Sequence, residues 1–310
     1  MNGSDNESPA VGALTEAERA AQLVFPRKER SLWTDALMRF MRNKLAVASS
    51  VVVFILLILA IFAPWIAPTH YDKQVYSEAW QFPSATHLMG TDPFGRDVLS
   101  RIIYGARISM SVALIVNAAS FFVGAPIGAM AGWFGGVIDY ILMRTVDVMS
   151  AFPTLLFAIL MMTILGSGLT NIYIAMAVTS WIPVARLVRG QILSLREQDF
   201  VLAARAIGAK DGHIMWRHLI PNSLAPVIVA LTLGIPSAIM GEAGLSFLGI
   251  GVNAPIPSWG KMLNEYLTHI QSHWYLSTFP AIMIALTMYA FNLMGDGLQD
   301  ALNPTAKKQQ

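Results

Sequence analysis

The chain alternates long apolar blocks with short polar segments. Six blocks are long enough to cross a bilayer as a helix, which takes about 17 to 25 apolar residues. We expect spans at residues 45–66, 109–133, 146–165, 172–188, 224–245 and 276–294. Gly and Pro inside these blocks are tolerated in spans that pack on neighbours. The pattern predicts an all-α polytopic membrane protein whose six transmembrane helices form one domain, residues 45–304.

The segments that flank this domain are polar or amphipathic. Residues 1–31 are polar and end in a basic cluster, so we expect a disordered cytoplasmic tail there. Residues 32–44 place apolar side chains on one helical face and charges on the other, which predicts an amphipathic helix in the membrane interface; a soluble helix that packs on a partner is the alternative. Its apolar positions are Trp33, Leu37, Phe40 and Met41. Residues 305–310 form a short C-terminal cytoplasmic tail.

Composition and charge support this assignment and set its orientation. The chain is 55% hydrophobic and only 13% charged, against about 25% charged in soluble domains. If the N-terminus is cytoplasmic, sixteen of the 21 Lys and Arg residues fall on the cytoplasmic side, so both termini are predicted inside. The net charge of +2 gives no reason to expect a nucleic-acid partner, and the absence of Cys excludes disulfides and Cys nucleophiles.

Two predicted outer segments are long, residues 67–108 and 250–275. In the first, a turn at residues 92–95 precedes an amphipathic helix, which we expect to lie flat on the outer surface and cap the spans. Asp97 and Arg101 have the i, i+4 spacing of an ion pair on the polar face of that helix. Its apolar face is predicted to hold Val98, Leu99, Ile102, Ile103 and Ala106.

The largest inward loop, residues 197–221, is patterned rather than linker-like. Small residues predict a compact helix surface, Gly208 ends that helix, and a second helical turn runs on to Pro221, which opens the fifth span. The small surface is formed by Ala203, Ala204 and Ala206, and the second turn by Ile214, Met215 and Leu219. We therefore predict a stiff helical hairpin, which can transmit the movement of a partner to the spans on either side.

The same loop resembles the "EAA" loop of ABC-importer permeases. The resemblance rests on Ala203-Ala204-Arg205-Ala206-Ile207-Gly208-Ala209 and Arg217-His218-Leu219-Ile220-Pro221-Asn222, with Leu202 and His218 departing from the usual Glu and Ile. It implies a loop that docks on an ATPase. The implied coupling residues are Ala203, Ala204, Arg205, Ala206, Gly208, Ala209, Met215, Leu219 and Pro221.

Residues 90–107, 241–260 and 291–304 further resemble the second permease of dipeptide and oligopeptide importers. This resemblance covers about residues 33–304 and implies import by alternating access across the bacterial inner membrane. The implied partners are a homologous permease, two cytoplasmic ATPase subunits that bind ATP and Mg²⁺, and an external binding protein. Importers of nickel, opines and glutathione share these signatures and remain alternatives.

Charges near membrane depth are candidate functional groups because they are costly there. Glu242, near the outer end of the fifth span, is a candidate for the outer gate, with pairing to a partner as the alternative. Asp139, Arg144 and Asp147 are expected to form an inner-interface network in which Arg144 reaches either carboxylate.

No constellation for catalysis or for a resident cofactor emerges. The chain has no GxxxxGK[ST] motif, so energy must come from another chain. His213 and His218 are spaced wrongly for two metal ligands on one helix face, and His269 and His273, although at i, i+4, are more typical of a solvated interface helix; we predict no metal site. An ion-driven secondary transporter would need a carboxylate at the bilayer midplane, and an intramembrane enzyme a Ser/Lys, paired Asp or HExxH arrangement; the spans contain none of these.

Overall fold

A computed structural model describes residues 32–302, which are helical with no β-strand in that range. The long helices are α3 (Lys44–Ile61), α5 (Val98–Phe134), α8 (Leu169–Leu195), α11 (Ile220–Phe247) and α13 (Tyr275–Leu302). Shorter ones are α2 (Leu32–Arg42), α4 (Ala63–Ile66), α6 (Gly136–Ser150), α7 (Thr154–Leu165), α9 (Asp199–Ala206), α10 (Asp211–Ile214) and α12 (Trp259–Tyr266). A π-helical turn, Met215–Leu219, joins α10 to α11, and 3₁₀ turns lie at Tyr76–Glu78 and Leu267–His269.

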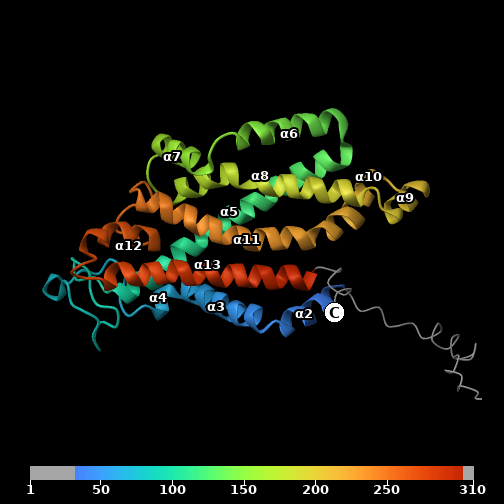
Figure 1. Ribbon diagram of the computed structural model, residues 1–310. Coiled ribbons are helices and arrows are strands. Elements are labelled where there is room, and N and C mark those ends of the chain that lie inside the picture. The colour runs from blue at the N-terminus through green and yellow to red at the C-terminus, as the bar shows by residue number, and fades with distance from the viewer. Residues whose placement is uncertain (1–31, 303–310) are drawn as a thin grey trace, which may run out of the picture.

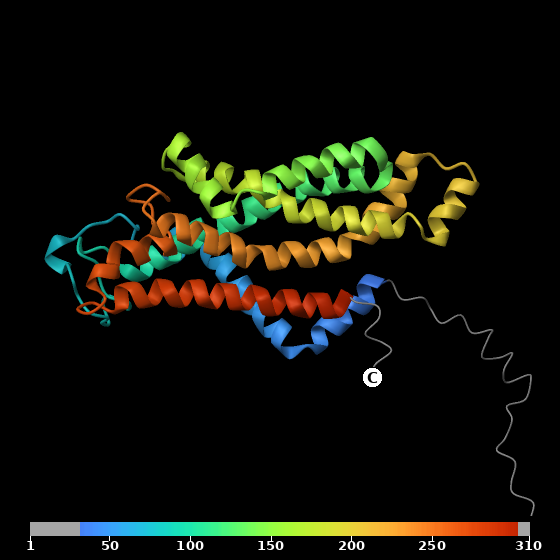
Figure 2. The ribbon, with the colours of Figure 1, turned by 45° about the horizontal axis from the view of Figure 1, so that its top comes forward.

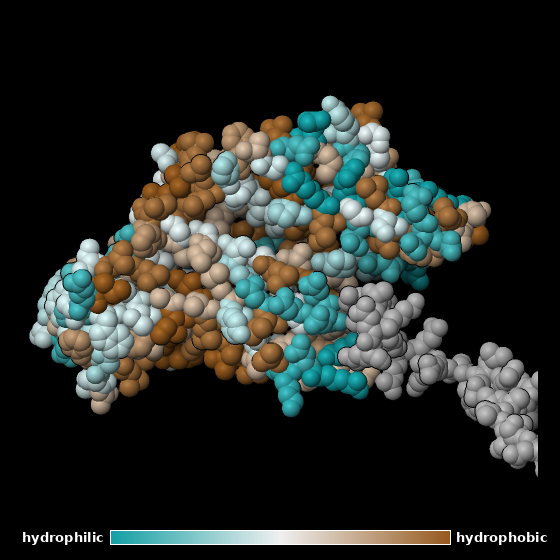
Figure 3. Space-filling view, viewed as in Figure 1, coloured by the Kyte–Doolittle hydropathy of each residue, from teal (hydrophilic) through white to brown (hydrophobic). Residues whose placement is uncertain are grey.

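The long helices run lengthwise in one bundle (Figures 1 and 2). α6 and α7 lie over α8 on one side, and α2 and α3 flank α13 on the other. One end of the bundle, the hairpin end, carries α9 and α10; the other, the loop end, carries residues 67–97 and α12. The space-filling view shows polar surface at both ends and extensive hydrophobic surface between them (Figure 3), as expected for a chain that spans a membrane.

Five helices are long and apolar enough to span a membrane, and α6 with α7 makes a sixth if the bent pair is one span. The predicted third span, residues 146–165, is therefore not one straight helix. α6 and α7 meet at an angle of 80°, and α7 begins directly after Pro153. Proline removes a backbone donor and disfavours helical geometry at the residue before it, which accounts for the break.

The predicted flat helix over the spans is wrong, because residues 98–134 form the single helix α5. Its 37 residues correspond to a length of about 55 Å, well beyond the roughly 30 Å of a bilayer core. The first turns of α5 therefore project from the membrane as a direct extension of the span. Both faces of this extension are covered, since Arg101 is as fully buried as Val98.

α5 and α8 pack with their backbones unusually close. Three glycines at four-residue spacing on α5, Gly124, Gly128 and Gly132, face the α8 backbone. A Cβ atom at Gly124 would lie 2.5 Å from the carbonyl oxygen of Trp181, and one at Gly132 would lie 2.9 Å from that of Arg189. Small residues permit such approach in membrane helices, so α5 and α8 form one tightly packed pair.

Candidate functional site

The hairpin between α8 and α11 is the clearest candidate site, and its turn is built around Gly208. α9 ends at Ala206, and Gly208 follows with a φ of +80°. The amide of Gly208 donates to the carbonyl of Arg205 at 2.9 Å, and that of Ala209 to the carbonyl of Ala204 at 3.0 Å. These two bonds define a Schellman motif, which satisfies the open carbonyls of the last helical turn. Gly208 thus ends the first arm as the sequence predicted.

The second arm runs without interruption into the membrane. α10 continues through the π-helical turn into α11, whose first turn contains Pro221. Pro221 therefore lies inside a continuous helical stretch, where it removes one backbone donor, and the π-helical turn ends two residues before it. The hairpin is thus fixed to α8 on one side and α11 on the other, as predicted.

Buried side chains anchor the hairpin to the ends of α5 and α8. Val201 and Ile214 are fully buried, and they belong to one hydrophobic cluster with Trp133 of α5 and Ile192 of α8. The guanidinium of Arg205 lies 4.5 Å from the centre of the Trp133 ring, a cation–π contact. Packed side chains therefore connect the hairpin directly to α5 and α8.

The predicted coupling residues divide between this anchor and the free surface. Ala203, Ala206 and Gly208 are exposed, whereas Ala204 and Leu219 are buried in the anchoring cluster and cannot contact a partner. Arg205 is exposed but turned onto Trp133, Ala209 and Met215 are half-buried, and Pro221 is exposed.

Two large apolar side chains of the hairpin are mostly exposed, Ile207 at the turn with 85% and Trp216 in the π-helical turn of the second arm with 74% exposure. Neither residue was among the predicted coupling residues. A large apolar residue in an otherwise polar, water-facing loop is a signal that would have identified them.

The predicted network on α6 exists with different partners. The Arg189 guanidinium of α8 donates to both carboxylate oxygens of Asp139, at 2.5 and 2.6 Å. Arg186, also of α8, pairs with Asp147 at 3.1 Å. Arg144 reaches neither carboxylate and instead lies over the Tyr140 ring at 5.3 Å. The predicted pairing of Arg144 with Asp139 or Asp147 was wrong, because α8, which packs beside α6, supplies the arginines for both carboxylates.

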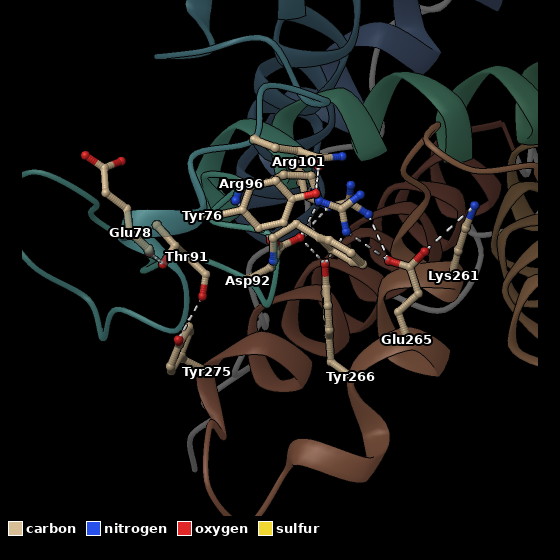
Figure 4. Close-up of polar contacts among 12 residues, drawn as sticks. Tyr76, Glu78, Thr91, Asp92, Arg96, Arg101, Lys261, Glu265, Tyr266 and Tyr275 are labelled. Atoms are coloured by element: carbon tan, nitrogen blue, oxygen red, sulfur yellow. Dashed lines mark hydrogen bonds and ion pairs between the residues drawn. The ribbon is translucent and has the colours of Figure 1, made fainter.

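A buried charge cluster holds the loop end together (Figure 4). Asp92 accepts from Arg96 Nε at 2.5 Å and from the Tyr266 hydroxyl at 2.8 Å. Arg101, with no exposed side-chain surface, donates to Glu265 at 2.9 Å. These contacts tie the turn before α5 and the first turns of α5 to α12, which lies more than 150 residues later in the chain.

The expected Asp97–Arg101 pair does not form. Asp97 caps the start of α5 by accepting from the Ser100 amide at 2.7 Å, and it also contacts His87 Nδ1 at 3.0 Å. The side chains of Asp97 and Arg101 are both buried, so neither lies on an exposed polar face. Local i, i+4 spacing could not reveal that distant α12 supplies the carboxylate for Arg101.

Burial also changes the acid–base behaviour of this cluster. Loss of hydration lowers the pKa of Lys261, against the opposing effect of Glu265 3.8 Å away. Burial raises the pKa of the Tyr266 hydroxyl well above its usual range, so Tyr266 remains a hydrogen-bond donor to Asp92. The cluster is built to hold loops in place.

Glu242 is not part of an outer gate in this structure. Its side chain is fully buried between α5 and α11, where it accepts hydrogen bonds from Ser109 at 3.0 Å and Ser246 at 2.7 Å. The position of Glu242 near the end of a predicted span suggested access to a pathway. The structure instead makes Glu242 an internal hydrogen-bonding group.

The histidine pairs are engaged with aromatic rings. His269 and His273 both face Trp80, with ring centres 4.7 and 4.4 Å away, and the rings of His213 and His218 lie 6.1 Å apart. Across residues 32–302 no group of three or more His, Cys, Asp and Glu side chains could hold a metal ion.

Comparison with known proteins identifies this arrangement. A family model described as a binding-protein-dependent transport system inner membrane component matches residues 124–308, and one described as the N-terminal TM domain of oligopeptide transport permease C matches residues 31–83. The solved structure described as "Inward facing conformations of the MetNI methionine ABC transporter" aligns with a TM-score of 0.54 at 18% identity. It covers 65% of this chain and 95% of that one, which shows a shared fold.

Full-length relatives agree with the family models. The chain is 44% identical over 294 residues to the dipeptide transport system permease protein DppC of Bacillus subtilis (strain 168), covering 94% of this chain and 92% of that protein. It is 40% identical over 300 residues to the oligopeptide transport system permease protein OppC of the same organism, covering 97% of each. It is 41% identical over 298 residues to the glutathione transport system permease protein GsiD of Escherichia coli O6:K15:H31 (strain 536 / UPEC), covering 94% and 96%. The chain therefore belongs to the family of binding-protein-dependent inner membrane transport components: it is an ABC-importer permease, a transport subunit rather than an enzyme, that works with ATPase and binding-protein partners.

Proposed function

We propose that this chain is one of two homologous permeases in an importer of dipeptides and oligopeptides. The observation that supports its mechanical role is the hairpin, which is anchored to α5 and α8 and exposes Ile207 at its turn and Trp216 on its second arm. Exposed apolar side chains on a rigid hairpin suit insertion into a groove of an ATPase subunit. The names of the DppC and OppC relatives support peptides as the substrate.

The proposed cycle is alternating access. ATP and Mg²⁺ bind to two cytoplasmic ATPase subunits, and their closure moves the hairpin. Because buried side chains connect the hairpin to α5 and α8, that movement tilts both helices and switches the paired permeases between inward-open and outward-open states. The external binding protein delivers the peptide and sets its selection.

Reconstituted uptake tests the substrate and the partners together. The complex is purified from its native membrane, its companions are identified, and uptake of a labelled dipeptide into ATP-loaded proteoliposomes is measured with the cognate binding protein. Glutathione is the second candidate because the GsiD relative is 41% identical. Peptide uptake that excess glutathione does not reduce supports the proposal. A complex that contains no ATPase, or that transports only glutathione, nickel or an opine, contradicts it.

The proposed orientation places both termini and the hairpin in the cytoplasm. The described chain begins and ends at the hairpin end of the bundle (Figure 1), in agreement with the distribution of Lys and Arg. Because the natural chain has no Cys, single-Cys variants at Lys73 and Lys210 report orientation directly. A membrane-impermeant maleimide added to intact spheroplasts is expected to label the variant at Lys73 and spare that at Lys210. The opposite pattern would reverse the orientation.

A further inference from the structure

A groove at the loop end contains a cation that no other residue in the range 32–302 pairs with. Its volume is about 460 Å³, and its walls come from four parts of the fold: α4, the loop that follows it, α5 and the start of α8, with Ile256 and Pro257 completing the rim. The groove is mainly apolar. Arg107 of α5 is its one side chain with a permanent charge.

Arg107 is exposed, and within the described range 32–302 it makes no ion pair, hydrogen bond or ring contact. Three other cations of the loop end belong to the buried cluster with Asp92 and Glu265, namely Arg96, Arg101 and Lys261. Lys73 is exposed. Arg107 therefore retains five donors for an external acceptor, in the planar arrangement that suits carboxylate and phosphate groups.

Rigid rings form the wall beside Arg107. Tyr104 lies one turn before it on α5, and the ring of Tyr71 packs edge-on against Tyr104 at 4.9 Å. His70 completes the set, 4.4 Å from Tyr71 and 5.4 Å from Tyr104. Since these rings contact one another, the wall beside Arg107 is already formed in the absence of a ligand.

The groove lies at the level of a bilayer surface. It is bordered by Pro64, where the first span ends, and by Leu169, where α8 begins. Arg107 is nine residues into α5, or about 14 Å below its tip, which matches the part of α5 that projects from the membrane. Trp65, 77% exposed, and Phe62, 47% exposed, lie within two residues of Pro64 in the chain and are typical of the aromatic belt of a membrane interface.

We infer that this groove binds a phospholipid of the adjoining leaflet, the outer one in the proposed orientation, with the lipid phosphate on Arg107. The apolar wall of Ile108, Leu169 and Ile256 accommodates the first methylene groups of an acyl chain, and the rings flank the headgroup. A single unpaired cation above apolar walls at membrane level fits an anionic amphiphile. The site is independent of the transported substrate, so its test does not depend on the proposed function.

Native mass spectrometry of the delipidated importer complex, titrated with phosphatidylglycerol, tests the assignment. The variant Arg107→Gln removes the charge but keeps a polar side chain, and Lys73→Gln is the matched control at the other exposed, unpaired cation of this end. We expect affinity at one site per permease to fall about fivefold in Arg107→Gln, to stay unchanged in Lys73→Gln, and to be largely retained in Arg107→Lys.

Two further probes separate the sources of the phosphate chemistry. Diacylglycerol with the same acyl chains is expected to bind weakly, and inorganic phosphate at the lipid concentration is expected not to displace phosphatidylglycerol. The inference is overturned if Arg107→Gln titrates like the natural chain, if both Gln variants weaken binding equally, if diacylglycerol binds as well, or if inorganic phosphate displaces the lipid. Loss of the partner permease from the Arg107→Gln complex would also overturn it, because the groove would then be a protein interface.

Discussion

Replacing Gly208 tests the hairpin without disturbing its packing. The residue has a φ of +80°, and a Cβ atom added there meets no heavy atom within 4 Å. The penalty for Gly208→Ala is therefore one of backbone conformation, about 1–2 kcal/mol for an L-residue in the left-handed region. A β-branched residue, as in Gly208→Val, costs more because its χ1 is also restricted. This penalty lowers the population of the intact turn about 5- to 30-fold. If docking requires the intact turn, docking falls with it.

The assay is ATP hydrolysis stimulated by the binding protein and peptide in proteoliposomes, together with the yield of ATPase that co-purifies with the permease. Both quantities are expected to fall in Gly208→Ala and further in Gly208→Val. Gly208→Asn should retain most of both, because Asn tolerates the left-handed region better than Ala.

Gly212 provides the matched control. It lies in α10 of the same hairpin, and a Cβ atom there also meets nothing within 4 Å, so Gly212→Ala adds the same methyl group to a helical position. We expect no loss of activity, since Ala favours a helix by about 1 kcal/mol over Gly. Full activity in Gly208→Val, or equal damage in Gly212→Ala, would refute the role assigned to this turn.

Three further changes test other parts of the structure. Gly128→Leu would force a side chain into the α8 backbone, so the complex should lose about 1–3 kcal/mol of stability. Gly190→Ala, with open space around the added methyl group, should not lose stability. An unchanged melting temperature for Gly128→Leu would contradict the close packing of α5 and α8. Arg189→Gln removes the bidentate pair with α6 and should lower stability by about 1 kcal/mol, while Arg144→Gln should have little effect. A larger loss of thermal stability in Arg144→Gln than in Arg189→Gln would instead support the predicted pairing of Arg144 with the carboxylates of α6. Burial, with repulsion from the neighbouring imidazole, lowers the pKa of His273 below its ordinary 6.5. The lowered pKa stabilises the folded form fully above pH 6.5. This contribution to the free energy of unfolding declines as the pH falls below 6.5, because the unfolded state binds the proton more tightly. The protection factors of the loop stacked on this ring, in which the intrinsic pH dependence of amide exchange is divided out, should fall on acidification. Protection factors that do not change with pH would exclude the effect.

The sequence predicted features that depend on one segment at a time. Apolar length predicted six spans, of which five correspond to single long helices and one to the bent pair α6 and α7. The pattern around Gly208 predicted both the helix end and the second arm that leads to Pro221. Signals of this kind are local, since periodicity and capping depend on residues within a few positions of one another.

Features that depend on tertiary contacts were missed. Arg101 pairs with Glu265 across 164 positions, and Arg189 pairs with Asp139 across 50. A single sequence gives no indication of which helices will lie side by side, so spacing suggested the nearer partners Asp97 and Arg144. For the same reason Glu242 was considered a candidate for the outer gate, although neighbouring hydroxyl groups enclose it.

The continuity of α5 has a consequence for regulation. One end of this helix is fixed in the buried charge cluster, and its other half is packed through glycines on α8, which leads into the hairpin. Because α5 is packed at both ends, a change in its tilt moves the residues around it at both faces of the membrane. If a protein bound at the hairpin end changes the affinity of the loop end for its own partner by some factor, thermodynamic linkage requires that partner to change the affinity at the hairpin end by the same factor. Signalling across the bilayer then needs no chain of separate switches, because the same helix is present on both sides.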